Sequence, residues 1–104
     1  MKANTHFSVG DLVHHKLFDY RGVIADVDPF LMLSDEWYNT VALSRPPKNR
    51  PWYRVLVHDA ILETYVAERN LEPDPSGAPV RHPLIEICFQ GFSDGRYLTA
   101  EPIN

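Results

Sequence analysis

Cysteine is almost absent from this sequence. Its single cysteine, Cys88, excludes a disulfide within the chain. Long apolar runs are missing as well, because the longest covers only residues 30–33 and is too short to cross a membrane. The residues that follow Lys2 contain no apolar stretch of signal-peptide length. We therefore expect a protein of the reducing cytoplasm that has no membrane partner.

The common signatures of enzymes are scarce too. The five glycines are scattered, and none of them forms a glycine-rich phosphate-binding loop. The metal-ligand spacings Cys-x-x-Cys and His-x-x-x-His do not occur. Cys88 stands between Ile87 and Phe89, an apolar setting that predicts an inert thiol. We expect no enzymatic activity and no bound metal.

Two groups of titratable residues carry alternative interpretations. His14 and His15 are adjacent, so on a strand they point to opposite faces and cannot grip one metal ion without a bulge. We expect one of them to pack in the sheet and the other to face water. Asp26 and Asp28 share one strand face, where paired acids can act as general acid and base. Their place just before Pro29 favours a turn-capping role instead.

The order of strand and turn signals predicts a mainly β fold. Four segments are rich in β-branched and aromatic residues and are separated by turn signals, namely residues 12–13, 23–27, 52–57 and 61–67. Ser34 is a helix N-cap that begins one short helix, which ends near Leu43. The proline-rich residues 45–51 must then form a loop. We expect a small SH3-like, partly open antiparallel β-barrel with one short helix and a packed C-terminal tail.

The domain boundaries follow from the same signals. Residues 7–98 contain the strands and the apolar tail, so we expect them to form a single domain. Residues 1–6 and 99–104 are then terminal extensions.

Charge is distributed unevenly along the chain, whose net charge is −4. Residues 1–54 hold seven Lys and Arg against six Asp and Glu, a net charge of +1. Residues 55–104 hold three against eight, a net charge of −5. An acidic protein is repelled by phosphate, so nucleic-acid binding would need a local basic patch.

One segment offers such a patch. Between residues 45 and 54 basic and aromatic residues interleave without an acid, which predicts phosphate contacts and stacking on bases. The candidate nucleic-acid-binding residues are Arg45, Lys48, Arg50, Trp52 and Arg54. The alternative is a solvated loop in which Trp52 and the neighbouring Tyr53 belong to the core.

A second surface is a candidate for protein interaction. Aromatic residues and methionine are enriched at the centres of protein interfaces. They gather around the first long loop, at Phe30, Met32, Trp37 and Tyr38. The alternative is that this segment only covers an open end of the barrel.

An ordered set of residues between 7 and 98 resembles the YccV-like family of hemimethylated-DNA-binding domains, which includes the bacterial heat-shock protein HspQ. The matching residues are Phe7, Gly10, Val13 and His15 in the opening, Tyr20, Gly22, Val23 and Asp26–Pro29 in the second strand, and Pro51–Tyr53, Val55, Tyr65, Ala67–Glu68 and Leu71 in the central hairpin. Val80–Pro83, Phe89 and Gly95–Tyr97 resemble the ending of some members.

The resemblance implies a small antiparallel β-barrel without a cofactor. It implies two roles: binding of hemimethylated duplex DNA in the control of replication initiation, and a heat-shock role in protein degradation with an ATP-dependent protease and its substrates. The alternative function is a protein-interaction adaptor for such a protease with no affinity for DNA. Exposed strand edges need covering, and a symmetric homo-oligomer is one solution.

Overall fold

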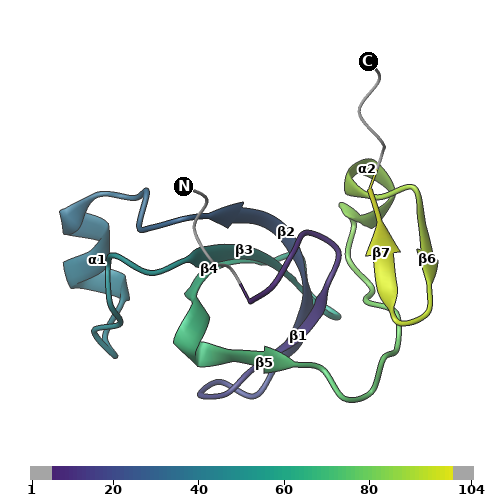
Figure 1. Ribbon diagram of the computed structural model, residues 1–104, viewed down its shortest axis with the longest axis horizontal. Coiled ribbons are helices and arrows are strands. Elements are labelled where there is room, and N and C mark those ends of the chain that lie inside the picture. Colours follow the sequence, from purple (N-terminus) through teal and green to yellow (C-terminus); the bar gives the residue numbers. More distant parts are fainter. Residues whose placement is uncertain (1–5, 100–104) are drawn as a thin grey trace.

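The computed structural model describes residues 6–99 and shows a mainly β fold (Figure 1). Its elements, in chain order, are β1 (Leu12–His15), β2 (Arg21–Asp28), α1 (Asp35–Val41), β3 (Trp52–Val57), β4 (Glu63–Ala67), the 3₁₀ helix η1 (Glu68–Asn70), β5 (Leu71–Pro73), α2 (Ile85–Cys88), β6 (Gly91–Ser93) and β7 (Arg96–Leu98). No helix within residues 6–99 has the length and apolar character needed to cross a membrane.

Five strands form one antiparallel sheet in the order β4-β3-β2-β1-β5, and β6 and β7 form a separate hairpin. The five-stranded sheet curls so that β5 faces β3 across the interior (Figure 1). Its edge strands β4 and β5 follow each other in the chain through η1, but they do not pair. The mainly β class is therefore confirmed, whereas residues 6–99 form an open sheet and no closed barrel.

β3 carries core residues on both of its faces. Tyr53 and Val55 point into the curl of the sheet, and Trp52 and Leu56 point to the opposite face. This alternation is the period-two pattern of a strand that is buried on both sides. Helix α1 covers the Trp52 end of the outer face, and the C-terminal tail covers the Leu56 end.

The centre of the sheet depends on a glycine in β2. A Cβ atom on Gly22 would lie 2.4 Å from the carbonyl oxygen of Leu56 and 2.6 Å from Cγ1 of Val55. The sequence left open whether this glycine allows positive φ or a close backbone approach. The structure shows the close approach, because only a residue without a Cβ atom fits against β3 here.

Helix α1 begins and ends close to the predicted positions. The Ser34 hydroxyl oxygen accepts a hydrogen bond from the Trp37 backbone N–H at 3.1 Å, which is N-cap geometry. The helix ends at Val41. The hydroxyl of Tyr38, a buried residue of the helix, donates to the Pro46 carbonyl oxygen at 2.7 Å. This bond fastens the proline-rich loop to the helix.

The C-terminal tail packs on the sheet, as its apolar content predicted. Val80, Phe89 and Tyr97 are buried against Leu12 and Leu56. The tail forms α2 and the β6–β7 hairpin, neither of which was expected, so the prediction of a single α-helix is wrong. β4 also begins two residues later than the predicted strand, because Ile61 and Leu62 belong to the exposed turn after β3.

Candidate functional site

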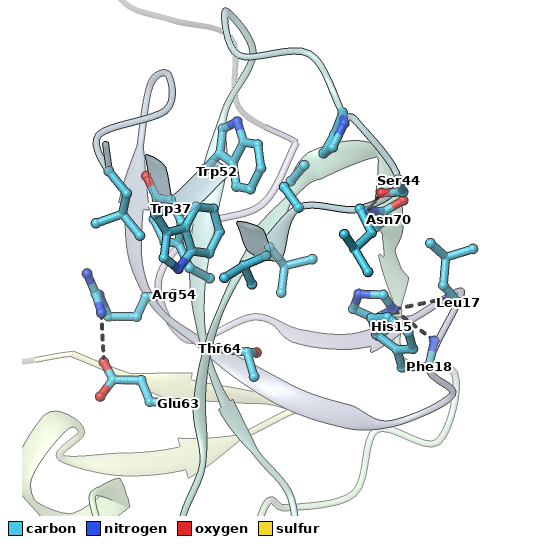
Figure 2. A pocket seen from close by; sticks show the side chains of 18 of the residues that line it. His15, Leu17, Phe18, Trp37, Ser44, Trp52, Arg54, Glu63, Thr64 and Asn70 are labelled. Carbon is cyan, nitrogen blue, oxygen red and sulfur yellow. Dashed lines mark hydrogen bonds and ion pairs between the residues drawn. The ribbon is translucent and has the colours of Figure 1, made fainter. Parts of the chain in front are cut away.

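An apolar groove crosses the edge strand β4. Its volume is about 450 Å³, within the range of roughly 300–1,000 Å³ that is usual for ligand-binding pockets. The turn between β1 and β2 lines it with Leu17 and Phe18, and α1 with the following loop lines it with Trp37, Leu43 and Ser44. In Figure 2, Trp37 and Trp52 lie on one side of Thr64 of β4, and His15, Leu17 and Phe18 lie on the other. We call this hollow the β4 groove.

The β4 groove exposes large apolar side chains to solvent. Phe18 is 75% exposed and Leu43 is 80% exposed, and Leu17 and Val41 are also exposed. Because these four side chains gather around one hollow, they form a patch of the kind that marks an interaction site. The charged side chains of the lining, Arg54 and Glu63, form an ion pair at 3.6 Å (Figure 2).

His15 holds the β1–β2 turn in place. Its Nδ1 accepts hydrogen bonds from the backbone N–H groups of Leu17 and Phe18, both at 3.1 Å (Figure 2). Its ring is buried and stacks on Phe18 with the ring centroids 4.8 Å apart. Burial lowers the pKa of His15, and the neighbouring His14 lowers it further. The ring is therefore neutral at pH 7, which is the state that leaves Nδ1 free to accept.

His14 points to the opposite face, as the alternation along a strand requires. Its two ring nitrogens each lie 2.7 Å from a carboxylate oxygen, one of Asp19 and one of Glu72. These hydrogen bonds, that of Asp19 first, raise the pKa of His14. The residue links the β1–β2 turn to β5. Within residues 6–99, no group of three His, Cys, Asp or Glu side chains is arranged to hold a metal ion.

Three aromatic rings form the inner part of the groove. Trp52 stacks on Tyr65 with the ring centroids 5.3 Å apart, and Trp37 contacts both rings edge-on at 5.8 and 5.6 Å. The Tyr65 hydroxyl donates to Asp28 Oδ2 at 2.6 Å. Burial and this carboxylate raise the pKa of Tyr65 to about 12, so the hydroxyl keeps its proton. Asp28 thus has a structural role, and Asp26 Oδ1 accepts from the Val27 backbone N–H at 2.9 Å.

The aromatic residue of the candidate nucleic-acid set is part of the core. Trp52 is only 1% exposed, and its indole N–H donates to the Pro47 carbonyl oxygen at 3.2 Å. Tyr53 is also buried. Trp52 and Tyr53 therefore fit the alternative interpretation, in which both residues belong to the core, since a buried ring offers no face on which a base can stack.

Three of the four cations of that set have partners within the chain. Lys48 pairs with Asp35 at 3.0 Å, Arg54 pairs with Glu63, and Arg45 donates to the amide oxygen of Asn39 at 2.8 Å. Arg45 and Lys48 also lie against the ring of Tyr38, 5.4 and 4.6 Å from its centroid. Arg50 is exposed and forms no ion pair with another described residue. Arg54 and Trp52 line the β4 groove, and the other three do not.

Of the four candidate protein-interaction residues, only Trp37 lines the β4 groove. Trp37 is half-buried and lines the β4 groove, whereas Tyr38 is buried beneath it. Phe30 and Met32 are exposed on the loop after β2 and lie outside the groove lining. The Met32 backbone N–H donates to the Tyr65 hydroxyl oxygen at 3.1 Å, which ties this loop to β4.

The prediction of an apolar setting for Cys88 is wrong. Helix α2 is a single turn that packs Ile85 against the core and leaves the next positions facing solvent, so Cys88 is exposed and Ile87 is 78% exposed.

Residues 91–95 read Gly-Phe-Ser-Asp-Gly, the spacing of a nucleophile elbow. They form the β6–β7 hairpin instead of a strand-to-helix turn, and Ser93 has no hydrogen bond to an acid or a histidine of the described chain.

Sequence reasoning missed most of the β4 groove. Leu17, Phe18 and Leu43 were not among the candidate residues. A signal existed at the first two positions, because apolar side chains in a short turn have no core to enter. Leu43 gave no such signal, since its exposure depends on how the chain leaves α1.

The curled sheet and the groove define a small, mainly β domain with an apolar hollow at its edge strand. Residues 5–96 match the sequence profile of the YccV-like family, described as "Hemimethylated DNA-binding protein YccV like". The chain belongs to this family, as the resemblance predicted. Curated relatives include F-box only protein 21 of Homo sapiens, of Pongo abelii and of Mus musculus. Each is 31% identical over 94 residues, which is 88% of this chain and 15% of the relative.

Proposed function

We propose that this chain is a non-catalytic binding domain that recognises an extended segment of polypeptide in the β4 groove. The observation that supports this function is the gathering of four exposed apolar side chains around a hollow of about 450 Å³. Burying them on a partner removes apolar surface from water, which is the main driving force of association.

Polypeptide suits this lining better than nucleic acid does. A phosphate backbone needs cations that are free to exchange counterions for phosphates. The lining has one cation, Arg54, and Glu63 already neutralises it. Extended peptides instead offer apolar side chains and backbone amides, which match an apolar hollow beside a strand.

The biological role that we propose is that of an HspQ-type adaptor in the cytoplasm. The groove would hold a substrate segment while the rest of the domain contacts an ATP-dependent protease in stress-linked degradation. The similarity to 15% of F-box only protein 21 fits a module that serves one binding task inside different proteins. We also propose that residues 7–98 are the folding unit and that it has SH3-like connectivity, because η1 links β4 to β5 and β5 returns to pair with β1.

Substitutions in the groove test this function. We expect Phe18→Ser and Leu43→Ser each to weaken peptide binding at least tenfold, since each removes roughly 1.5–3 kcal/mol of apolar burial. Ile61→Ser is the matched control, because Ile61 is 83% exposed and does not line the groove. Fluorescence anisotropy with a panel of labelled eight-residue peptides that alternate apolar and polar residues measures the effect. If no peptide of the panel binds the wild-type protein at millimolar concentration, the proposed function is wrong.

Binding of hemimethylated duplex DNA, with a role in replication initiation, is the second candidate function. The description of the matching family and the exposed Arg50 support it. To bind phosphates, Lys48 would have to leave Asp35 and Arg54 would have to leave Glu63. Arg45 would have to give up its hydrogen bond to Asn39. Anisotropy at low salt with hemimethylated, fully methylated and unmethylated duplexes tests this function. Preference for the hemimethylated duplex, lost in Arg50→Ala, would support it, and equal or absent binding would remove it.

A further inference from the structure

The backbone of β4 carries hydrogen-bonding groups that point away from the sheet. The Val57 N–H donates to the Leu62 carbonyl and the Glu68 N–H donates to the Pro51 carbonyl, both at 3.1 Å, one at each end of the strand. Because antiparallel bonding alternates, the even-numbered positions between them face β3. The outward-facing residues are Glu63, Tyr65 and Ala67. Their N–H groups have no hydrogen-bond partner among residues 6–99.

This open edge lies at the floor of the β4 groove. All five residues of β4 line the groove, and apolar side chains flank the strand on both sides. Trp37 lies on one side of Thr64, and Leu17 and Phe18 lie on the other (Figure 2). An added strand sends alternate side chains to opposite faces, so each set would meet an apolar wall.

Three cationic residues, Lys16, Arg45 and Arg69, belong to the segments that meet at one end of the groove. The guanidinium group of Arg69 donates to the carbonyl oxygen of Ser44, which lines the groove, and Arg45 follows Ser44 in the chain. The exposed Lys16 donates its backbone N–H to the carbonyl of Asn70, which also lines this end, at 2.9 Å. The nearby Glu68, whose carboxylate accepts from the Tyr53 hydroxyl at 2.6 Å, is one acidic residue against these three cationic residues. This end therefore favours an acidic group on the partner, although the chain as a whole is acidic.

From these three observations we propose that an extended polypeptide binds as a sixth strand on the β4 edge, with alternating apolar side chains and an acidic residue at the Ser44 end. The inference rests on the proposed function and adds the mode of recognition. Main-chain hydrogen bonds to Glu63 and Tyr65 give affinity for any extended chain, and the two apolar walls select its side chains. A domain that binds this way accepts many unfolded segments, which suits an adaptor for degradation.

A proline in the edge strand tests the backbone contacts. Glu63→Pro removes an outward N–H without touching a bond to β3, since proline is tolerated on the free side of an edge strand. Glu63→Ala is the matched control, because it removes the same carboxylate and its ion pair with Arg54 but keeps the N–H. We expect Glu63→Pro to bind an alternating, aspartate-ended peptide at least tenfold more weakly than Glu63→Ala does. Equal loss in both variants would overturn the proposal.

The peptide provides a second test that does not depend on the folding of a variant. N-methylation of alternate peptide residues blocks pairing when the methyl groups point toward β4. When the other set of residues is methylated, the methyl groups point to solvent and pairing is kept. We expect one methylated set to abolish binding and the other to keep it. Amide hydrogen exchange should show new protection at Glu63 and Tyr65 when the peptide binds.

The outcomes separate the mode of binding from the function. Peptide binding that perturbs the groove but leaves the Glu63 and Tyr65 amides unprotected overturns strand addition and keeps the proposed function. Absence of any peptide binding overturns both. Protection of the same amides that rises with protein concentration, together with a dimer in light scattering, would show that a second copy occupies the edge and would overturn the proposed partner.

Discussion

The two faces of β1 give the neighbouring residues His14 and His15 different environments. His15 accepts two backbone N–H bonds and is buried, whereas His14 lies between Asp19 and Glu72. Protonation of His15 would turn its Nδ1 from an acceptor into a donor and break its hold on Leu17 and Phe18. The apolar wall of the β4 groove therefore depends on the neutral form of one imidazole.

The pKa values of the two histidines should be shifted in opposite directions from 6.5, the ordinary value for histidine. Burial lowers the pKa of His15, and the hydrogen bonds to carboxylates raise that of His14. The stability that neutral His15 contributes is present above pH 6.5 and is lost as the pH falls through its lowered pKa. The contribution of His14 is present below pH 6.5 and is lost as the pH rises through its raised pKa.

NMR titration of the imidazole resonances measures this order directly. We expect His14 to titrate above 6.5 and His15 below it, with the amide resonances of Leu17 and Phe18 following His15. His14→Ala should move the His15 pKa upward, because the charge of His14 is one cause of its depression. Equal pKa values for the two residues would show that the turn does not depend on the acceptor role of His15.

At the scale of elements, β2 and β3 approach each other closely at Gly22. Gly22→Ala places a Cβ atom 2.4 Å from the Leu56 carbonyl oxygen, so the strands must move apart. We expect a loss of about 1–3 kcal/mol in the free energy of unfolding. Gly91→Ala is the control, since its Cβ atom would meet only Leu98 at 3.8 Å, an ordinary contact. Urea denaturation compares the two variants, and equal stability would show that the close approach is not needed.

Elements with strong local signals could be predicted from the sequence. β2, β3 and the start of α1 carry β-branched runs or a serine cap, and these preferences are local properties of the chain. β5 could not be found, because Leu71–Pro73 is three residues long and ends in proline, and only its pairing with β1 makes it a strand. The β6–β7 hairpin had a readable signal in Asp94-Gly95, where both residues have positive φ.

The β4 groove could not be predicted because it is a property of the whole molecule. Leu17, Leu43 and Tyr65 lie far apart in the sequence and meet only after the sheet curls and α1 docks. Sequence reasoning reached Trp37, Trp52 and Arg54 of its lining, but it assigned the last two to nucleic-acid binding. It had no means to see that Glu63 would pair with Arg54 across neighbouring strands.

The charge of the whole molecule bears on the choice between DNA and polypeptide. The net charge is −4, and three of the four cations between residues 45 and 54 are engaged within the chain. We therefore expect any binding to duplex DNA to show a shallow dependence on salt, with about one or two phosphates neutralised. Anisotropy between low and moderate salt measures this slope. A slope corresponding to four or more phosphates would show that the paired cations are released to DNA.

At the scale of the whole molecule, mapping the bound partner on the domain separates polypeptide binding in the β4 groove from DNA binding. The measurement is a pair of NMR titrations of the ¹⁵N-labelled chain, one with an alternating, aspartate-ended peptide and one with a hemimethylated duplex. We expect the peptide to shift the amide resonances of residues 17–18, 41–44 and 63–67, and the duplex to cause at most weak shifts around Arg50. Strong shifts across residues 45–54 with the duplex, and none with the peptide, would contradict polypeptide binding in the β4 groove.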